Sequence, residues 1–339
     1  MRLSDYKSIA VIQTAFIGDL VLALPMATAI KRAAPDCRLT FVTTPISAQI
    51  ATACSDIDNV LSYDKRGLEK GYSGIKAMAE KLKGCDLVIS PHRSLRSTII
   101  AKKSGAKTTV GFNTGSLSVL FSKRAKYNPK IHEIERNLKL LENFEDYEYD
   151  KDICARLTFN ETTIAEAEHK VEDISGPYVV LAPGSVWATK RWKGEYFAEL
   201  AKMIESKGLQ VVIIGGKEDI NIAEQITTST KAHSLAGKTS ILESIYIISK
   251  AKAIVTNDSS PIHFAGLVSC PTIAIFGATI PEFGFAPRGK KDKAIGVENM
   301  KCRPCGIHGG RKCPIGTHDC MKKITPEQVF SELWHLLTD

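Results

Sequence analysis

VTNDSSPIHFAG, residues 255–266, predicts the turn around which the rest of the chain is organised. The apolar residues 253–255 are typical of a buried strand, and the polar residues after them supply helix-capping side chains followed by Pro261. The first amides of such a helix lack partners within it, and the positive end of its dipole points outward. The turn can therefore bind a phosphate through backbone N–H groups and the hydroxyls of Ser259 and Ser260. An ordinary capped helix without a ligand is the alternative.

A second stretch has a related design. YVVLAPGS, residues 178–185, predicts a strand and a turn, and residues 195–206 follow as an amphipathic helix. Between them, the sequence WATKRWK places basic side chains where a diphosphate would need them. Lys190 is the best candidate for a point-charge contact to phosphate, whereas Arg191 and Lys193 are equally compatible with a solvated surface.

Strands and helices alternate on both sides of an acidic, unpatterned run at 145–152, which predicts an α/β protein with mainly parallel sheets. A chain of 339 residues is long enough for two domains with separate cores. We place these domains at residues 1–155 and 156–325, followed by an amphipathic helix at 326–339. Strands are expected at 8–12, 39–43, 60–62, 86–90, 108–111, 179–182, 210–215, 253–256 and 272–276, and one helix is expected at 20–34.

Composition and charge exclude several classes of protein. The hydrophobic content of 44% and the charged content of 24% are those of a globular protein. The N-terminus enters a strand without the apolar core of a signal peptide, and no apolar run approaches a membrane span, so we expect the cytoplasm. Residues 1–150 carry a net charge of +6 out of a total of +8, which suits an anionic acceptor or the anionic face of a membrane. This excess does not argue for nucleic acid, and a basic surface without a specific partner is the alternative.

Six blocks of the second half carry a family resemblance. They are PGS (183–185), KRW (190–192), GGKED (215–219), LAGKTS (235–240), NDSSPIH (257–263) and FGAT (276–279). In this order they resemble the donor-binding half of glycosyltransferase family 9, the bacterial ADP-heptose:lipopolysaccharide heptosyltransferases. The first half is similar in IGDLVLALP, residues 17–25, so the resemblance spans most of the chain.

The resemblance implies the GT-B fold, an α/β architecture of two Rossmann-like domains facing a cleft. Residues 1–155 would bind the acceptor and residues 156–325 would bind the nucleotide-sugar donor. The terminal helix would pack back towards the first domain.

The implied reaction is an inverting transfer, without metal or other cofactor, of heptose from ADP-L-glycero-D-manno-heptose to the inner core of lipopolysaccharide. A cysteine-rich stretch near the C-terminus makes the chain most like the second heptosyltransferases of the family. The family's catalytic aspartate corresponds to Asp19, for which a helix-dipole contact without catalysis is the alternative. Lys190 and the helix start would stabilise the leaving diphosphate, and Glu218 would reach the ribose. The other expected donor contacts are Ser185, Asp258, Ser259, Ser260 and His263.

Three groups of basic residues fall where loops should leave the first sheet. Arginine and lysine recognise carboxylate and phosphate, which suits the acidic sugars and phosphates of an inner lipopolysaccharide core. Solvated loop charge is the alternative for each residue. The expected acceptor-binding residues are Lys65, Arg66, Arg93, Arg96, His132 and Arg136, the last two within HEIERN, a block that resembles the start of the family's acceptor-side helix. We accordingly expect peripheral contact with the cytoplasmic face of the inner membrane.

Two metal-like motifs occur in the sequence. Four cysteines lie within 19 residues, and they could form a tetrahedral zinc site or remain as packed free thiols. The second pair is spaced more widely than zinc knuckles prefer, which favours thiols. Residues 56–58 spell the D-x-D of metal-dependent glycosyltransferases, but they are expected in a polar turn away from the donor site. The cysteines are Cys302, Cys305, Cys313 and Cys320.

Other functions are separated by simple features. The first strand lacks the G-x-G-x-x-G fingerprint, which argues against a nicotinamide cofactor. Two alternatives stay open: another GT-B glycosyltransferase or nucleotide-sugar enzyme with a different donor, and a non-catalytic sugar-nucleotide-binding protein.

Overall fold

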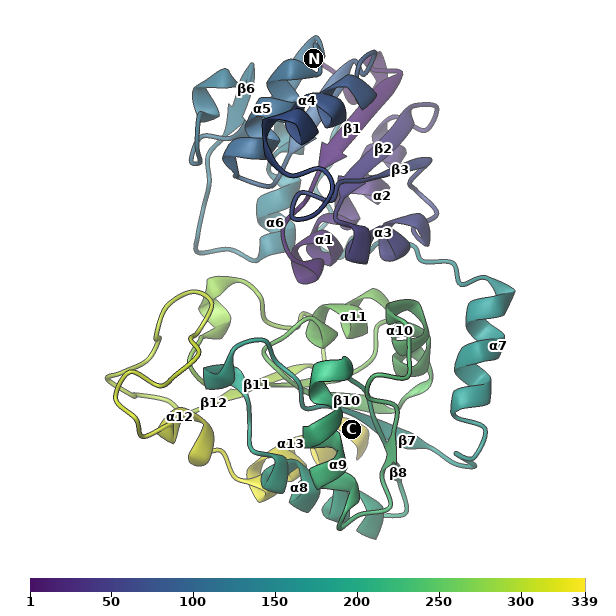
Figure 1. Cartoon of the computed structure of the whole chain (residues 1–339), viewed down its shortest axis with the longest axis vertical. Helices are drawn as coiled ribbons and strands as arrows, with labels where there is room; N and C mark the ends of the chain where they lie inside the picture. Colours follow the sequence, from purple (N-terminus) through teal and green to yellow (C-terminus); the bar gives the residue numbers. More distant parts are fainter. Residues whose placement is uncertain (339) are drawn as a thin grey trace. The chain divides into compact units, whose positions relative to one another are not determined.

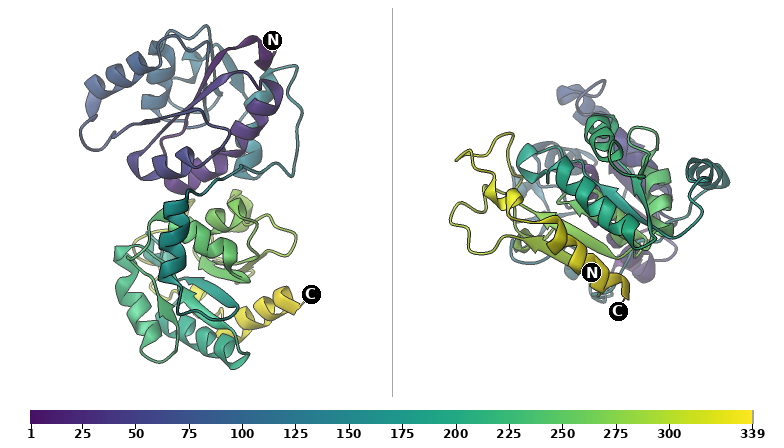
Figure 2. Two further views of the ribbon diagram at one scale, coloured as in Figure 1. Left: turned by 90° about the vertical axis from the view of Figure 1, so that its right-hand side faces the viewer. Right: turned by 90° about the horizontal axis from the view of Figure 1, so that it is seen from below.

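The computed structural model describes residues 1–338 and divides the chain into two compact units (Figures 1 and 2). The first unit is Met1–Thr158 and the second begins at Phe159, three residues beyond the boundary expected from the sequence. Residue 339, the last of the expected terminal helix, lies outside the described residues.

Each unit contains a six-stranded parallel sheet, as the alternating pattern predicts. The first sheet has the order β3-β2-β1-β4-β5-β6 and the second has the order β12-β11-β10-β7-β8-β9. Counted along its own unit, each sheet has the order 3-2-1-4-5-6 of the doubly wound fold. The strands are β1 (Ser8–Ile12), β2 (Arg38–Thr43), β3 (Asn59–Ser62), β4 (Leu87–Ser90), β5 (Thr108–Phe112), β6 (Lys123–Ala125), β7 (Tyr178–Ala182), β8 (Gln210–Ile213), β9 (His233–Ser234), β10 (Ala253–Asn257), β11 (Thr272–Phe276) and β12 (Lys293–Gly296).

The strand order reverses at the centre of each sheet. The two neighbours at this switch point are β1 and β4 in the first unit and β7 and β10 in the second. Ligands of doubly wound folds bind beyond the carboxyl ends of such strands, because the connections leave them towards opposite faces. The loops after these four strands, together with the first turns of the helices that follow them, contain nine of the 14 site residues predicted from the sequence.

Helices cover both faces of the first sheet (Figure 2). The apolar sides of α4 and α5 pack with Ala10, Ile12 and Val88 on one face. On the other side of the sheet, α1 and α2 contact α6, and α3 contacts α1. The helices are α1 (Ile17–Ala23), α2 (Pro25–Ala33), α3 (Pro45–Thr52), α4 (Gly71–Lys81), α5 (Leu95–Lys103) and α6 (Glu133–Leu138).

The single helix expected at 20–34 is wrong, because the structure has two. The first ends at Ala23, Leu24 follows as the junction, and α2 begins at Pro25. Proline lacks a backbone N–H and its ring clashes with the preceding turn, so it is accommodated where a helix starts.

The second unit closes its core with its last helix. One face of the sheet packs on α8, α9 and α13, including Val329, Leu333 and Leu336 of α13. Thus α13 belongs to the core of the second unit, and its expected packing back towards the first domain stays a prediction. Its apolar side is used against α8, with which it makes its main contacts. The helices are α7 (Glu161–Lys170), α8 (Gly194–Ser206), α9 (Ile220–Thr227), α10 (Ile241–Lys250), α11 (Pro261–Leu267), α12 (Asp319–Lys322) and α13 (Pro326–Thr338).

Three edge strands, β6, β9 and β12, were not predicted. They have two to four residues and include charged or polar side chains, so no apolar run marks them in the sequence. None of the helices within residues 1–338 combines the length and the apolar composition needed to cross a bilayer.

Candidate active site

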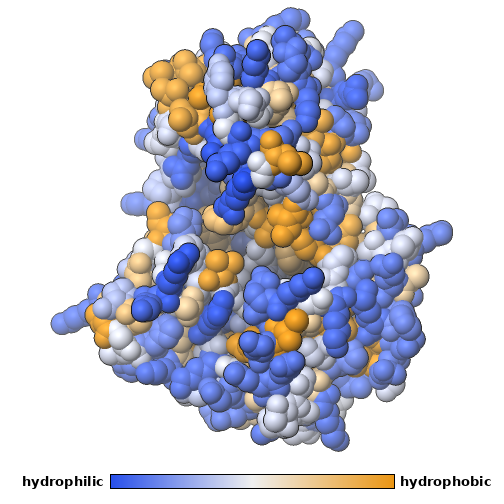
Figure 3. All heavy atoms as spheres, viewed as in Figure 1, coloured by the Kyte–Doolittle hydropathy of each residue, from blue (hydrophilic) through white to orange (hydrophobic). Residues whose placement is uncertain are grey.

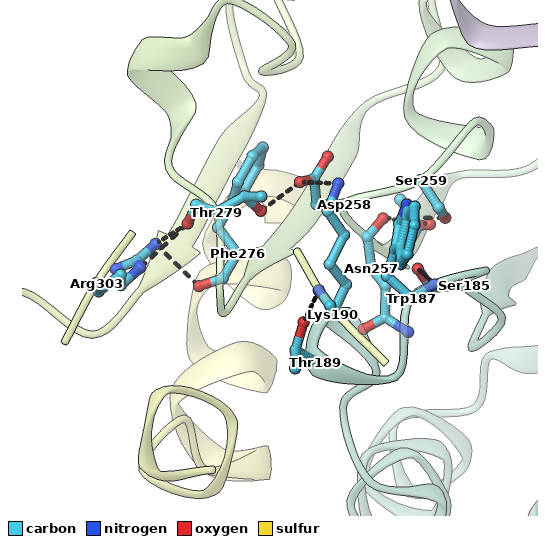
Figure 4. A network of polar contacts seen from close by, with 12 residues as sticks. Ser185, Trp187, Thr189, Lys190, Asn257, Asp258, Ser259, Phe276, Thr279 and Arg303 are labelled. Atoms are coloured by element: carbon cyan, nitrogen blue, oxygen red, sulfur yellow. Dashed lines mark hydrogen bonds and ion pairs between the residues drawn. The ribbon is translucent and has the colours of Figure 1, made fainter. Parts of the chain in front are cut away.

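A nearly buried ion pair lies at the switch point of the second sheet (Figure 4). Lys190 ends the short helix η4 (Ala188–Lys190) after β7, and Asp258 directly follows β10. Lys190 Nζ lies 2.7 Å from Asp258 Oδ2, and the two side chains are only 12% and 8% exposed. The Thr279 hydroxyl, beyond the end of β11, donates to the same carboxylate oxygen at 2.5 Å. The cation is therefore held in a fixed position at the carboxyl ends of three adjacent strands.

Asn257 fixes the two loops that carry this ion pair. Its buried side-chain amide donates to the Pro183 carbonyl at 2.7 Å and accepts the Trp192 backbone N–H at 3.1 Å. The Ser259 hydroxyl adds a bond of 3.2 Å to the Gly184 carbonyl. Since Asn257 and Ser259 belong to one loop and their partners to the other, the two stretches singled out in the sequence are joined directly.

The cysteine-rich segment contributes an arginine clamp that the sequence did not reveal (Figure 4). The Arg303 guanidinium donates from Nε and Nη2 to the Thr279 carbonyl at 3.1 and 2.8 Å. It also reaches the Phe276 carbonyl at 3.0 Å and the Val297 carbonyl at 2.6 Å. Arg303 therefore fixes the backbone of the residue whose hydroxyl holds Asp258.

The same segment is attached next to Lys190. The Thr189 backbone N–H donates to the Gly310 carbonyl at 3.1 Å, and the Gly310 N–H donates to the Thr189 hydroxyl at 2.8 Å. Further along, the buried Trp192 indole donates to the Ile324 carbonyl at 2.9 Å. The segment from 303 to 324 thus supports the ion pair from two sides.

The structure brings two more predicted donor residues to this site. Ser185 is 8% exposed, and its carbonyl accepts a bond of 2.6 Å from Arg191 Nε. His263, in the first turn of α11, has its pKa lowered to about 4 by burial and by the nearby Lys190 ammonium. Its imidazole is therefore neutral at physiological pH, and it can donate one hydrogen bond from one ring nitrogen and accept another at the other nitrogen.

Two predicted donor residues differ from the simple expectation. Ser260 occupies the N-cap of α11, but its side chain makes no capping bond. Glu218 lies exposed on η5 (Lys217–Asp219), while its neighbour Asp219 turns inward and accepts the Gly216 N–H at 2.9 Å. A side chain at Gly184 would collide with the Asp219 carboxylate, so the two loops approach each other closely there.

In the first unit, the loops after β1 and β4 meet in the same way. The Thr14 hydroxyl lies 3.0 Å from His92 Nδ1, and Lys65 Nζ donates to the Thr14 carbonyl. Burial, assisted by Lys65, lowers the pKa of His92 to about 4, so this imidazole is neutral. Burial and the neighbouring guanidinium groups of Arg66 and Arg96 also lower the pKa of Lys65.

Asp19 is the third residue of α1 at this edge of the sheet and is half-buried. Its carboxylate accepts the Phe16 backbone N–H at 3.1 Å, the contact expected of a residue in the first helical turn. Its negative charge acts on Lys65 and, with burial, raises the pKa of Glu133. Asp19 therefore lies near charged side chains from the loop after β3 and from the start of α6. Its capping bond leaves the catalytic assignment a prediction.

The six predicted acceptor residues are not equivalent. Arg66, Arg93 and Arg96 are exposed, and the Arg93 guanidinium stacks 3.8 Å above the Tyr127 ring. Arg136 is only 2% exposed and pairs with Glu133 at 2.6 Å. Further bonds from Arg136 to backbone carbonyls of 128 and 129 show that it fixes the loop before α6. His132 is the N-cap of α6 and accepts the backbone N–H of residue 134.

The two metal-like motifs have different surroundings. Asp56 is buried and pairs with Arg156; burial raises its pKa, but the bonds from Arg156 and Thr28 lower it further, giving a net decrease. Residues 56–58 therefore stabilise the first unit. All four cysteines of the C-terminal cluster are free thiols, and four backbone N–H groups of 315–318 lower the pKa of Cys313. Within residues 1–338, no three metal-binding side chains converge on one position.

Comparison with known proteins shows the family to which this chain is similar. A sequence model described as glycosyltransferase family 9 (heptosyltransferase) matches residues 75–311. Lipopolysaccharide heptosyltransferase 2 of Salmonella typhimurium is 30% identical over 204 residues. That alignment covers 56% of this chain and 57% of the relative, so the match spans just over half of each.

Two solved structures share the fold over nearly the whole chain. The glycosyl transferase family 9 protein of Veillonella parvula has a TM-score of 0.86 at 22% identity, covering 98% of this chain and 97% of that one. The E. coli ADP-heptose lps heptosyltransferase II has a TM-score of 0.77 at 21% identity, covering 97% and 98%. The predicted GT-B class, with two Rossmann-like domains, is confirmed.

Proposed function

The chain belongs to glycosyltransferase family 9, and from this premise we propose that it transfers heptose from ADP-L-glycero-D-manno-heptose to the inner core of lipopolysaccharide. The observation that carries the proposal is the Lys190–Asp258 ion pair at the switch point of the second sheet. A fixed cation at this position suits the diphosphate of a nucleotide sugar. The similarity to heptosyltransferases named 2 or II supports addition of the second heptose.

In the proposed donor site, Lys190 binds the diphosphate and neutralises the charge that develops as ADP leaves. Asp258 and Thr279 keep the ammonium in position, which lowers the cost of ordering it in the transition state. Ser185, Ser259 and Ser260 supply hydroxyl and backbone donors, and neutral His263 contributes one further hydrogen bond. Glu218 binds the ribose from the edge of the site.

The proposed reaction is a single inverting displacement. Asp19 takes the proton of the acceptor hydroxyl while that oxygen forms a bond to the anomeric carbon of the heptose. The bond from this carbon to the diphosphate oxygen breaks, and the electron pair leaves with ADP. Lys190 stabilises part of the negative charge that develops on the diphosphate, and the proposed mechanism uses no metal ion.

The acceptor, in this proposal, is the anionic inner core, and the enzyme works on the cytoplasmic face of the inner membrane. Arg66, Arg93 and Arg96 are exposed and contact its carboxylates and phosphates. Lys65, His132 and Arg136 have structural bonds of their own and position the loops that contact the acceptor.

A product assay tests the proposal. Purified protein is incubated with inner-core acceptor and either ADP-heptose or UDP-sugars, with and without EDTA. The masses of the products are then measured by mass spectrometry. We expect one added heptose from ADP-heptose alone, with the same rate in EDTA. Donor binding without transfer would favour a sugar-nucleotide-binding protein, and a preference for UDP-sugars would favour another GT-B enzyme.

A further inference from the structure

A polar cavity of about 620 Å³ lies in the first unit, where the loop after β6, the end of α6 and the short helix η3 (Leu141–Asn143) meet. This volume is within the range of about 300–1,000 Å³ that is typical of ligand sites. The polar residues that line the cavity are Lys126, Tyr127, Asn128, Lys139, Glu142 and Asn143. None of them is among the residues predicted from the sequence to bind donor or acceptor.

The loop from β6 to α6 forms a fixed wall of this cavity (Figure 1). The guanidinium of the buried Arg136 donates to the Asn128 carbonyl at 3.0 Å and to the Pro129 carbonyl at 2.8 Å. Its Nη1 also donates to the Tyr127 hydroxyl at 3.3 Å, and the Arg93 guanidinium stacks on the Tyr127 ring. A wall that is already held by these contacts needs little ordering when a ligand binds, which favours affinity.

The cavity has one excess positive charge and unused hydrogen-bonding groups. Lys139 Nζ pairs with Glu142 at 2.9 Å, which leaves the ammonium of Lys126 as the excess charge. Lys126 is exposed, and within the part of the chain that the structure describes its ammonium has neither a hydrogen bond nor an ion pair. Asn128 and Asn143 each use one side-chain atom in a bond of 3.0 Å to neighbouring backbone. The Nδ2 donor of Asn128 and the Oδ1 acceptor of Asn143 are left for a ligand.

These groups match an acidic sugar better than other anions. An ammonium pairs with a carboxylate as a point charge, and side-chain amides bond to hydroxyl groups. A phosphate is recognised mainly by arginine forks and rows of backbone N–H groups, but the fork of Arg136 is already used by the loop. A nucleobase stacks on an open aromatic face, and Arg93 covers one face of Tyr127. The surface of the first unit that Figure 3 shows is likewise mainly hydrophilic.

We propose that this cavity is a subsite for an acidic sugar of the acceptor, separate from the place where heptose is added. Lys126 pairs with the carboxylate of this sugar, and Asn128 and Asn143 bond to its hydroxyls. The loop with Asp19 follows β1, whereas the cavity follows β6, three strands further along the sheet. Since neighbouring strands are about 4.8 Å apart, the two positions are roughly 14 Å apart. The bound sugar is therefore a different residue of the acceptor from the one that receives heptose.

The inference rests on the proposed function, because the acceptor is the molecule that supplies the acidic sugar. Arg93 connects the cavity to the expected acceptor surface. It is exposed, and its guanidinium lies 3.8 Å above the ring of Tyr127, which lines the cavity. An acceptor that contacts Arg93 therefore lies next to the cavity.

Saturation-transfer NMR with the full chain tests the subsite without any transfer reaction. The probes are methyl β-D-glucuronide, an acidic sugar, and methyl β-D-glucoside, which has the same ring without the carboxylate. We expect the wild type to bind the glucuronide about five-fold more tightly than the glucoside, the upper end for an exposed ion pair. Lys126→Gln should remove this preference. Lys130→Gln is the matched control, because it removes the same charge from an exposed position of the same loop outside the cavity.

A second pair of variants predicts a gain of affinity, which a loss of folding cannot imitate. Glu142→Gln removes the carboxylate that repels the ligand and frees the ammonium of Lys139, so glucuronide binding should tighten by about two- to five-fold. Glu148→Gln removes the same charge from an exposed position outside the cavity and should leave binding unchanged. Inorganic phosphate at the concentration of the glucuronide should not displace it.

Four results would overturn the subsite: no binding of the glucuronide, equal binding of the two sugars, an equal effect of either variant and its control, or displacement by phosphate. Heptose transfer is measured separately. A chain that binds the glucuronide as expected but transfers no heptose refutes the proposed function alone. A chain that transfers heptose but does not bind the glucuronide refutes the subsite alone.

Discussion

Replacing Lys190 by methionine isolates the charge at the centre of the proposed donor site. Lys190 Nζ lies 2.7 Å from a carboxylate that is 8% exposed, so the cation serves both the fold and the ligand. A hydrogen bond to a charged group is worth about 1.5–3 kcal/mol, which predicts that ADP binds roughly 10- to 150-fold more weakly. Turnover should fall at least as far, because the charge on the leaving diphosphate grows in the transition state.

The stability of the unliganded protein should change as well. Loss of Lys190 leaves Asp258 with the Thr279 hydroxyl as its side-chain partner, and uncompensated buried charges cost several kcal/mol. We expect a decrease of about 2–3 kcal/mol in the unfolding free energy, since the remaining bond offsets part of this cost. Adding Asp258→Asn removes the buried charge and should restore part of the stability without restoring ADP affinity.

Calorimetric titration with ADP and denaturant unfolding give the two quantities. Lys193→Met is the matched control, because it removes the same charge from an exposed position in the same loop. Unchanged ADP affinity in folded Lys190→Met would refute the reasoning. An equal loss of ADP affinity in Lys193→Met would show that the effect depends only on the net charge of the protein.

Four further predictions follow from the same structure. Asp19→Asn keeps the cap but cannot take a proton, so transfer should fall roughly 10²- to 10⁴-fold at unchanged ADP affinity, and near-normal transfer by the folded variant would exclude it as the base. The pKa of His263 is about 4 in the folded protein and near 6.5 in the unfolded chain. The contribution of neutral His263 to stability is therefore complete above pH 6.5 and is lost as the pH falls towards 4. When the pH is lowered from 7 to 4.5, the unfolding free energy should decrease by roughly 2–3 kcal/mol more in the wild type than in His263→Gln. Equal decreases in the two proteins would contradict the assignment. In Arg303→Lys, the lysine cannot bond to the carbonyls of 276, 279 and 297 at the same time, so both the ADP affinity and the unfolding midpoint should decrease. A decrease in only one of the two would show that Arg303 does not support the nucleotide site. EDTA should leave transfer unchanged, and restoration of lost activity by Mg²⁺ alone would show that the charge of Lys190 is insufficient.

The elements that the sequence predicts well are those defined by local pattern. Strands β1, β7, β10 and β11 contain short runs of apolar residues bounded by turn residues, and all of their apolar positions are buried. The break at Pro25 shows where local reasoning was incomplete, because a helical period continued through the proline while the backbone could not. The edge strands had no apolar run to mark them.

The sequence indicated which residues belong to the site but not which residues they contact. Lys190 and Asp258 were both expected near phosphate, yet their ion pair joins loops far apart in the chain and depends on the register of β7 against β10. Arg303 was invisible because its partners are backbone carbonyls, which no side-chain pattern encodes. Arg136 had the opposite problem: its charge resembled a ligand contact, whereas burial gives it a structural role.

The bond from the Trp192 indole to the Ile324 carbonyl has a consequence for the order in which the protein folds during synthesis. A ribosome releases the Lys190 loop long before it has synthesised Arg303, Gly310 or the helix α13 that closes the second core. Non-local contacts of this kind form only once both partners are available. A chain that ends before residue 303 therefore lacks Arg303, Gly310 and Ile324 together, so the nucleotide site gains its supports only after the C-terminal segment has been synthesised.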